Sequence, residues 1–177
     1  MHTSIVRLWK KTLRQPRDTT VIHFAAATVL VVATSGAFLG SASSNATVSY
    51  PADYRKWAVT RRFQAGPESK VAGFHHYYAN ERALEGFNAG KFPDGSVIVD
   101  ELLAVDQQGG NSYEGKRLRI AVMMKDSARY AETGGWGFER GSGDSQELGA
   151  PADVRQACYS CHVKQKDHDF VFSKLRK

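Results

Sequence analysis

Two cysteines and a histidine lie close together near the C-terminus, in the pentapeptide Cys158-Tyr-Ser-Cys161-His162. This CxxCH spacing suits covalent attachment of haem, because two thiols can bond to the vinyl groups of the ring while the adjacent imidazole ligates the iron. A CxxC disulfide or half of a zinc site would not need the final histidine, and no second Cys/His pair in the sequence completes four zinc ligands. The pentapeptide therefore predicts one covalently bound haem c per chain, with His162 as an iron ligand.

The N-terminus has the features of an export signal, which agrees with haem attachment because that reaction takes place outside the cytoplasm. A basic segment precedes an uncharged stretch from Val21 to Leu39 that is rich in Ala, Val and Thr, and small residues at Ala42 and Ala46 follow at signal-peptidase spacing. We expect residues 1–46 to be a signal peptide that delivers the protein to the periplasm. The alternative is an uncleaved anchor of residues 21–39 in the inner membrane, which would be a weak membrane helix.

The net charge of +6 belongs mostly to this N-terminal segment, since five of the 24 basic residues and one of the 18 acidic residues precede residue 47. The rest of the chain has 19 basic and 17 acidic residues, so its charge gives no reason to expect a nucleic-acid partner. Residues 47–177 have the size of one ordinary domain with one core. Because the CxxCH motif uses both cysteines, no structural disulfide is expected, and burial of the porphyrin would supply roughly 25 cal/mol for each Å² removed from water.

Periodicity and turn residues predict an α+β fold, mainly an antiparallel sheet with short helices and the haem attached on a C-terminal helix. From 117 to 125 the residues alternate, with Leu118, Ile120, Val122 and Met124 on one face and Arg119, Ala121 and Met123 on the other. The other predicted elements, in chain order, are a short helix over 51–57, a strand over 74–78, a helix capped by Asn80 and ended by Gly90, a strand over 97–105, a short helix from 126 or 127 to 132, a strand over 136–140 and a helix that starts at Pro151 and carries the CxxCH motif.

Seven segments stand out by their order and spacing: Tyr50-Pro-Ala-Asp-Tyr-Arg-Lys-Trp57, Tyr78-Ala-Asn80, Gly90-Lys-Phe-Pro-Asp-Gly-Ser-Val97, Lys125-Asp-Ser-Ala-Arg-Tyr130, Gly135-Trp-Gly-Phe138, the CxxCH motif and Asp169-Phe-Val-Phe172. Together they resemble the P-460 family of c-type cytochromes over nearly the whole of 50–176. The resemblance implies a sheet-rich homodimer with one histidine-ligated haem per subunit and an open or weakly occupied distal position. Founding members oxidise hydroxylamine, whereas a sister branch, the beta type of cytochrome c-prime, binds nitric oxide without that chemistry.

The sequence departs from the founding members at three positions of the distal pocket. Founding members attach a lysine side chain to the ring from a Val-x-Val-Lys-Glu-Leu strand, and Asp100 stands in place of that lysine in Val97-Ile-Val-Asp-Glu-Leu102. By spacing, Ala121 replaces a glutamate that accepts protons, and Phe74 replaces an arginine. The resemblance therefore implies a haem pocket with Phe74 and Ala121 in its wall, without the cross-link and without the distal base.

Asp100 has two interpretations at this stage. It is either solvated on the wet face of its strand or placed in the distal pocket, where a carboxylate can relay protons to a bound substrate or peroxide. The sixth iron ligand is also open. His75, His76 and Met123 are candidates, with only one of the adjacent histidines able to face the haem, while His168 is expected at the surface. An open or water-bound position is the favoured state.

Three functions follow as expectations. The favoured one is binding or transformation of a small nitrogen-oxide ligand, such as nitric oxide, at an open haem site. The second is oxidation of hydroxylamine or a peroxidase-like reaction with help from Asp100. The third is electron transfer through a six-coordinate haem, which needs one of His75, His76 or Met123 as a ligand. The sequence names no redox partner.

Overall fold

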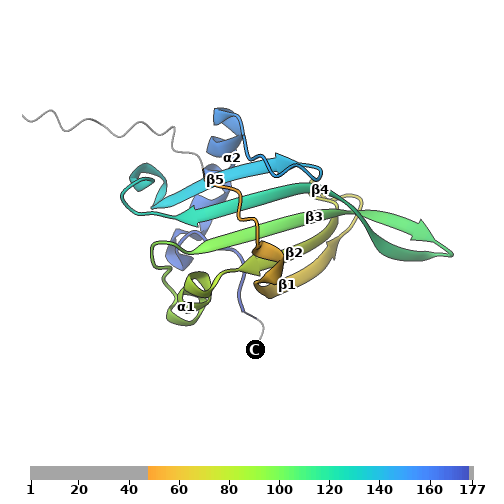
Figure 1. The fold of residues 1–177 in the computed structure, drawn as a ribbon, viewed down its shortest axis with the longest axis horizontal. Helices are drawn as coiled ribbons and strands as arrows, with labels where there is room; N and C mark the ends of the chain where they lie inside the picture. Colours follow the sequence, from red (N-terminus) through yellow and green to blue (C-terminus); the bar gives the residue numbers. More distant parts are fainter. Residues whose placement is uncertain (1–47, 176–177) are drawn as a thin grey trace, which may run out of the picture. The chain divides into compact units, whose positions relative to one another are not determined.

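The computed structural model describes residues 48–175, and it contains one five-stranded antiparallel sheet with the strands in chain order (Figure 1). The predicted signal peptide or anchor lies outside the described residues. Within 48–175, no helix has the length and hydropathy needed to cross a membrane. The elements are η1 (Tyr54–Lys56), β1 (Ala58–Ala65), β2 (Gly73–Ala79), α1 (Glu81–Ala89), β3 (Val97–Gln108), β4 (Asn111–Lys125), η2 (Ala131–Thr133), β5 (Trp136–Ser142), α2 (Ala152–His162) and η3 (Val163–His168). The predicted α+β class is confirmed.

The alternation predicted for 117–125 is confirmed from Arg119 onward, where it divides two hydrophobic clusters between the faces of the sheet. A register shift breaks it at Leu118, which is 41% exposed instead of facing the core with Ile120. Ile120 and Val122 belong to the cluster that includes Val48 and Tyr54 of the N-terminal segment. Met123 belongs to the other cluster, with residues of α1, α2 and the C-terminal segment packed around it. The cysteine-bearing helix therefore lies on the Met123 face of the sheet.

Helix α1 has the predicted ends. The side chain of Asn80 accepts a hydrogen bond from the backbone N–H of Ala83, and Gly90 closes the helix in the left-handed conformation. Asn80 also accepts from the N–H of Val97 at 3.0 Å. One side chain thus fixes both the start of α1 and the start of β3.

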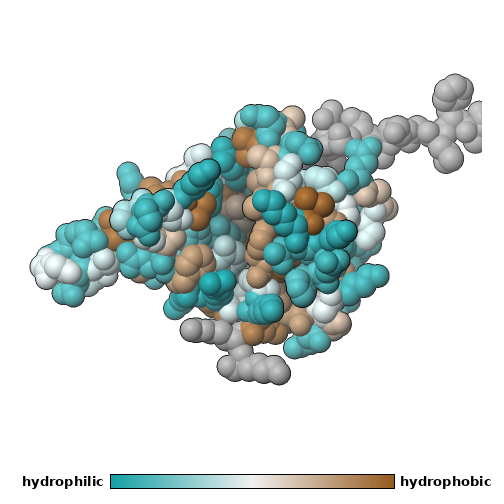
Figure 2. Space-filling model, turned by 180° about the vertical axis from the view of Figure 1, so that it is seen from behind, coloured by the Kyte–Doolittle hydropathy of each residue, from teal (hydrophilic) through white to brown (hydrophobic). Residues whose placement is uncertain are grey.

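The sheet is larger than predicted, because β1 was not expected and β3 and β4 continue as a hairpin beyond 105 and before 117. Gly109 and Gly110 form its two-residue turn, and both have positive φ, as a type I′ turn requires. The end of this hairpin extends past the other strands (Figure 1), and hydrophilic residues cover it (Figure 2). Residues 106–114 are exposed, so no hydrophobic alternation marked this part of the strands.

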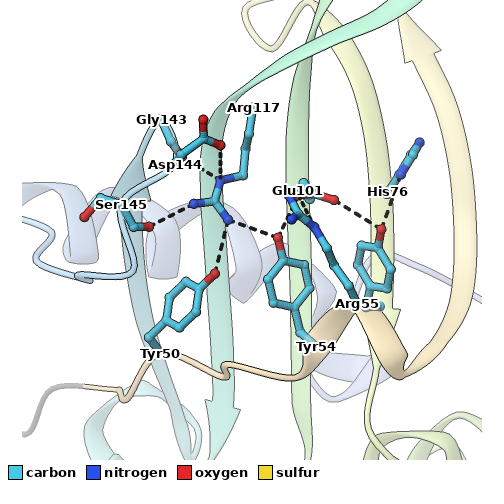
Figure 3. A network of polar contacts seen from close by, with 10 residues as sticks. Tyr50, Tyr54, Arg55, His76, Glu101, Arg117, Gly143, Asp144 and Ser145 are labelled. Carbon is cyan, nitrogen blue, oxygen red and sulfur yellow. Dashed lines mark hydrogen bonds and ion pairs between the residues drawn. The ribbon is translucent and has the colours of Figure 1, made fainter.

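A polar network holds the N-terminal segment on the face of the sheet opposite the cysteine-bearing helix (Figure 3). Glu101 is 2% exposed and accepts hydrogen bonds from the hydroxyls of Tyr54 and Tyr78 and from the Arg55 guanidinium. Arg117 is 6% exposed and donates to the hydroxyl of Tyr54 at 3.1 Å. Each of these buried charges therefore has hydrogen-bonding partners, as burial of a charge requires.

The segment between β4 and β5 differs from the prediction. Instead of a helix from 126 or 127 to 132, the chain forms turns and the single 3-10 turn η2. The carboxylate of Asp126 accepts from the N–H of Arg129, and Gly134 ends η2 in the left-handed conformation. The local hydrogen bonds of Asp126 and two following glycines leave too few residues for a longer helix.

Candidate haem site

A cavity of about 170 Å³ lies between α2, the C-terminal segment and strands β3, β4 and β5, on the Met123 face of the sheet. Figure 2 views the molecule from the side opposite to Figure 1. Aliphatic and aromatic side chains supply most of the wall, so a flat hydrophobic ring would be shielded from water there. The side chains in the wall that matter below are Ile98, Asp100, Ala121, Met123 and Phe138 from the sheet, Cys158 and His162 from α2, and Phe172 from the C-terminal segment.

His162 is held with one ring nitrogen free of backbone contacts. Its Nδ1 donates to the carbonyl oxygen of Phe170 at 2.7 Å. The ring packs between Phe138 and Phe172, with ring centroids 4.9 and 5.0 Å away. Burial lowers the pKa of His162, which favours the neutral imidazole. A neutral ring with Nδ1 donating leaves the Nε2 lone pair for a metal, the arrangement expected of a haem ligand.

The two cysteines are free thiols in the structure rather than a disulfide. Cys158 is half-buried at the cavity wall, where burial raises the pKa of its thiol, and Cys161 is exposed. Among residues 48–175, no group of three or more His, Cys, Asp or Glu side chains is arranged to hold a metal ion. Two free thiols beside a neutral histidine and an apolar cavity fit a haem c group.

Asp100 lies in the cavity wall, and its side chain is 16% exposed. One carboxylate oxygen is 2.8 Å from Nδ1 of His75, and the other is 3.5 Å from the guanidinium of Arg119. Ala121 pairs with Asp100 on the adjacent strand and also lines the cavity. Of the two placements considered for Asp100, the structure shows the one in the cavity wall and not the one on a solvated face of the strand.

His75 is buried behind Asp100 and is not free to bind iron. Its Nε2 is 2.8 Å from the carbonyl oxygen of Val71, so both ring nitrogens face acceptors. Although burial opposes the charged form, the contacts with Asp100 and Val71 raise the pKa of His75. Phe63 stacks on the imidazole with the ring planes 5° apart. These contacts favour a protonated His75 paired with Asp100.

The structure places the other candidate iron ligands in different parts of the molecule. His76 points to the opposite face of the sheet, where its Nε2 is 2.6 Å from a carboxylate oxygen of Glu114. His168 is exposed, as predicted. Of the candidates raised from the sequence, only Met123 lines the cavity.

Phe74 is not in the cavity wall, so its predicted place in the haem pocket is wrong. It lies on β2 at the same parity as Tyr78, whose ring belongs to the cluster on the opposite face. Tyr77, one strand position before Tyr78, lines the cavity instead. The spacing argument fails here because a one-residue shift in a strand moves a side chain to the other face.

Sequence reasoning also missed Phe138, Val171 and Phe172 as cavity residues. Phe138 follows Trp136 at strand spacing on β5, and both belong to the cluster on the cavity face. That alternation was a usable signal. The position of Val171 and Phe172 had no such signal, because the chain has left regular structure there.

The sheet, the apolar cavity and the neutral histidine next to two free thiols define a haem-binding protein in which the sheet forms one wall of the pocket. The model of the Cytochrome P460 family matches residues 51–173, and the chain belongs to this family. Membership makes it a haem c protein of that family. A comparison with curated proteins finds no match.

Proposed function

We propose that the protein is an exported mono-haem c-type cytochrome whose distal site is open and binds a small nitrogen-oxide ligand such as nitric oxide. The observation that carries this proposal is the arrangement of His75, whose two ring nitrogens are both engaged within the protein. With His76 on the other face of the sheet, strand β2 supplies no nitrogen ligand to the cavity. A bound haem supplies the iron to which a small ligand can bind.

The composition of the sheet wall supports the same proposal. Ile98 and Ala121 are apolar, and Ala121 is small, so this part of the wall leaves room for a diatomic ligand. This apolar part of the wall favours uncharged ligands, because its side chains offer a charged ligand nothing to replace its lost hydration. Ala121 also stands where the family resemblance places a proton-accepting glutamate, so the pocket lacks that carboxylate.

An optical spectrum of the purified ferrous protein tests the proposal. We expect a five-coordinate high-spin spectrum that changes on addition of nitric oxide. A low-spin spectrum that does not respond to nitric oxide, and that becomes high-spin in Met123→Leu, would contradict it and identify a six-coordinate electron carrier. Thr133→Ser, at the η2 turn outside the cavity, is a control that should bind like the wild type.

A second function, oxidation of hydroxylamine or a peroxidase-like reaction, is favoured by the placement of Asp100 in the cavity wall. There the carboxylate can accept or return a proton, and His75 and Arg119 orient it from behind. Under this proposal, Asp100→Asn should lower turnover of hydroxylamine or peroxide by about 10²-fold or more while haem content stays unchanged. Unchanged turnover and an unchanged pH profile would remove Asp100 from the reaction.

We also propose that the mature protein acts in the periplasm as a homodimer. The basic N-terminus, the uncharged stretch 21–39 and the small residues after it support export. The family resemblance supports the dimer. Cell fractionation with N-terminal sequencing tests the first proposal, and light scattering of the purified protein tests the second.

A further inference from the structure

The C-terminal segment, whose Phe170 carbonyl accepts a hydrogen bond from His162, is itself fixed to the sheet by a buried ion pair. Lys125, at the end of β4, is 5% exposed, and its Nζ donates to a carboxylate oxygen of Asp169 at 2.7 Å. The same ammonium donates to the carbonyl of Gly134 at 3.0 Å. Asp169 is 44 residues further along the chain, immediately before the residue whose carbonyl accepts from His162.

Asp169 is held at three points. Its second carboxylate oxygen accepts from the N–H of Phe92 at 2.8 Å, and its carbonyl accepts from the indole N–H of Trp136 at 2.9 Å. Trp136 is fully buried, so the hydrogen bond has a rigid donor. These contacts determine both the side-chain and the backbone position of Asp169.

Asp169 and Phe170 both have left-handed backbone conformations, with φ of 49° and 65°. For residues other than glycine this conformation is unfavourable, and two in succession persist only where surrounding contacts impose them. Phe170 is further fixed because its ring lies against Gly134, where an added Cβ would approach the ring to 2.2 Å. The result of this backbone turn is that the carbonyl of Phe170 meets Nδ1 of His162.

We propose that Lys125 and Asp169 are positioning residues for His162, and that by fixing the Phe170 carbonyl they would set how strongly the imidazole donates to a bound haem iron. The inference rests on His162 being the iron ligand, as under the proposed function. A hydrogen bond from Nδ1 raises the basicity of the coordinating nitrogen and fixes the ring plane. Neither Lys125 nor Asp169 lines the cavity, so both act through His162 rather than on the ligand.

Resonance Raman spectroscopy and redox titration of the haem-loaded protein test the proposal. In Lys125→Met and Asp169→Asn, we expect the iron–histidine stretching frequency to fall and the midpoint potential to rise, because a weaker hydrogen bond makes the imidazole a poorer donor and destabilises the ferric form. Asparagine tolerates the left-handed conformation, so Asp169→Asn removes the charge without imposing a new backbone.

Arg55→Met is the matched control. Arg55 donates to the buried carboxylate of Glu101 at 3.0 Å, so it belongs to an ion pair on the face of the sheet opposite the cavity. This variant should lose stability but keep both the stretching frequency and the potential. If Lys125→Met and Asp169→Asn fail to mature, Trp136→Phe removes the hydrogen bond to the Asp169 carbonyl while keeping an aromatic ring at this buried position, and it should shift both readouts in the same direction.

Unchanged frequency and potential in the folded variants would overturn the proposal. No ligand enters these measurements, so a protein that does not bind nitric oxide can still confirm it. A His162→Ala variant that keeps the wild-type haem spectrum would instead refute the assignment of His162 as the iron ligand.

Discussion

At the scale of single residues, Asp100 is the position where the protein departs most from the founding members that it resembles. A lysine there would offer a nucleophilic nitrogen, whereas Asp100 offers oxygen atoms that already contact His75 and Arg119. The wall of the pocket therefore contains an acidic group with a cationic partner behind it.

The His75–Asp100 pair predicts a pH dependence of stability. Because contacts in the folded protein raise the pKa of His75 above its ordinary value of 6.5, folding favours the protonated ring. This stabilisation is complete below pH 6.5 and is lost as the pH rises through the higher folded pKa. We expect the urea midpoint of the wild type to decrease across this range.

His75→Leu supplies the comparison for that titration. It should be less stable at pH 6 and should lack the decrease attributable to His75. His168→Leu, at an exposed position, is the control and should retain the wild-type pH dependence. Equal slopes for the wild type and His75→Leu would show that the pair does not titrate with folding.

At the scale of the elements, α1 shows how packing overrides helix propensity. Gly86 lies inside the helix, where glycine costs about 1 kcal/mol relative to alanine in an exposed position. Phe92 packs against it so closely that a Cβ would lie 2.8 Å from the Cα of Phe92 and closer still to its ring. The glycine is required by this approach.

Gly86→Ala should therefore destabilise the protein by about 1–3 kcal/mol through overpacking, despite the gain in helix propensity. Chemical denaturation measures the loss. Asn88→Ala, at an exposed position of the same helix, should be neutral or slightly stabilising. A more stable Gly86→Ala would mean that α1 can move away from Phe92 without cost.

A second prediction at this scale concerns Glu101 on β3, whose carboxylate joins this strand to η1 and β2 (Figure 3). Burial opposes its charged form, but hydrogen bonds from Arg55 and Tyr54 lower the pKa of Glu101 below its ordinary value of 4.5. Stability from this group is therefore complete above pH 4.5 and is lost as the pH falls through the lower folded pKa.

We expect Glu101→Gln to cost about 1–3 kcal/mol at pH 7, where the carboxylate is charged, and to weaken the acid dependence of unfolding. Urea titrations at pH 7 and pH 3 measure both effects. Asp53→Asn breaks an exposed ion pair with Lys56 and should change stability by less than about 0.5 kcal/mol. Similar losses in the two variants would contradict the role of burial.

Sequence patterns identified the elements whose signals are local. Asn80 and Gly90 marked α1, and the alternation through Ile120 and Met123 assigned the faces of β4. β1 was missed because most of its residues, Arg61 and Arg62 among them, are exposed. Phe74 was misplaced because register, which decides the face, is set by pairing with β3 and not by spacing along the chain.

At the scale of the whole molecule, the two faces of the sheet are stabilised differently. On the face covered by the N-terminal segment, tyrosines and buried charged side chains of the chain itself complete the packing. The other face contains the cavity, whose wall would be buried by the haem. The protein should therefore depend on haem for much of the packing on one face only.

A haem-free Cys158→Ala/Cys161→Ala variant should unfold at a Tm lower by roughly 10 °C, since the loss of about 2–3 kcal/mol shifts the Tm of a domain of this size by that amount. Thermal unfolding followed by circular dichroism measures the shift. Ser160→Ala within the same motif, at an exposed position, should leave the Tm within about 2 °C of the wild type. An unchanged Tm in the double variant would show that the chain packs without haem.

The strand order of the sheet has a consequence for biosynthesis. Every pairing joins strands that follow one another in the chain, so each hairpin can form from local contacts as soon as its residues are available. The two thiols come last, on α2, and no strand pairing includes them. Attachment of haem to these cysteines, as the CxxCH motif predicts, would therefore require no strand pairing to open.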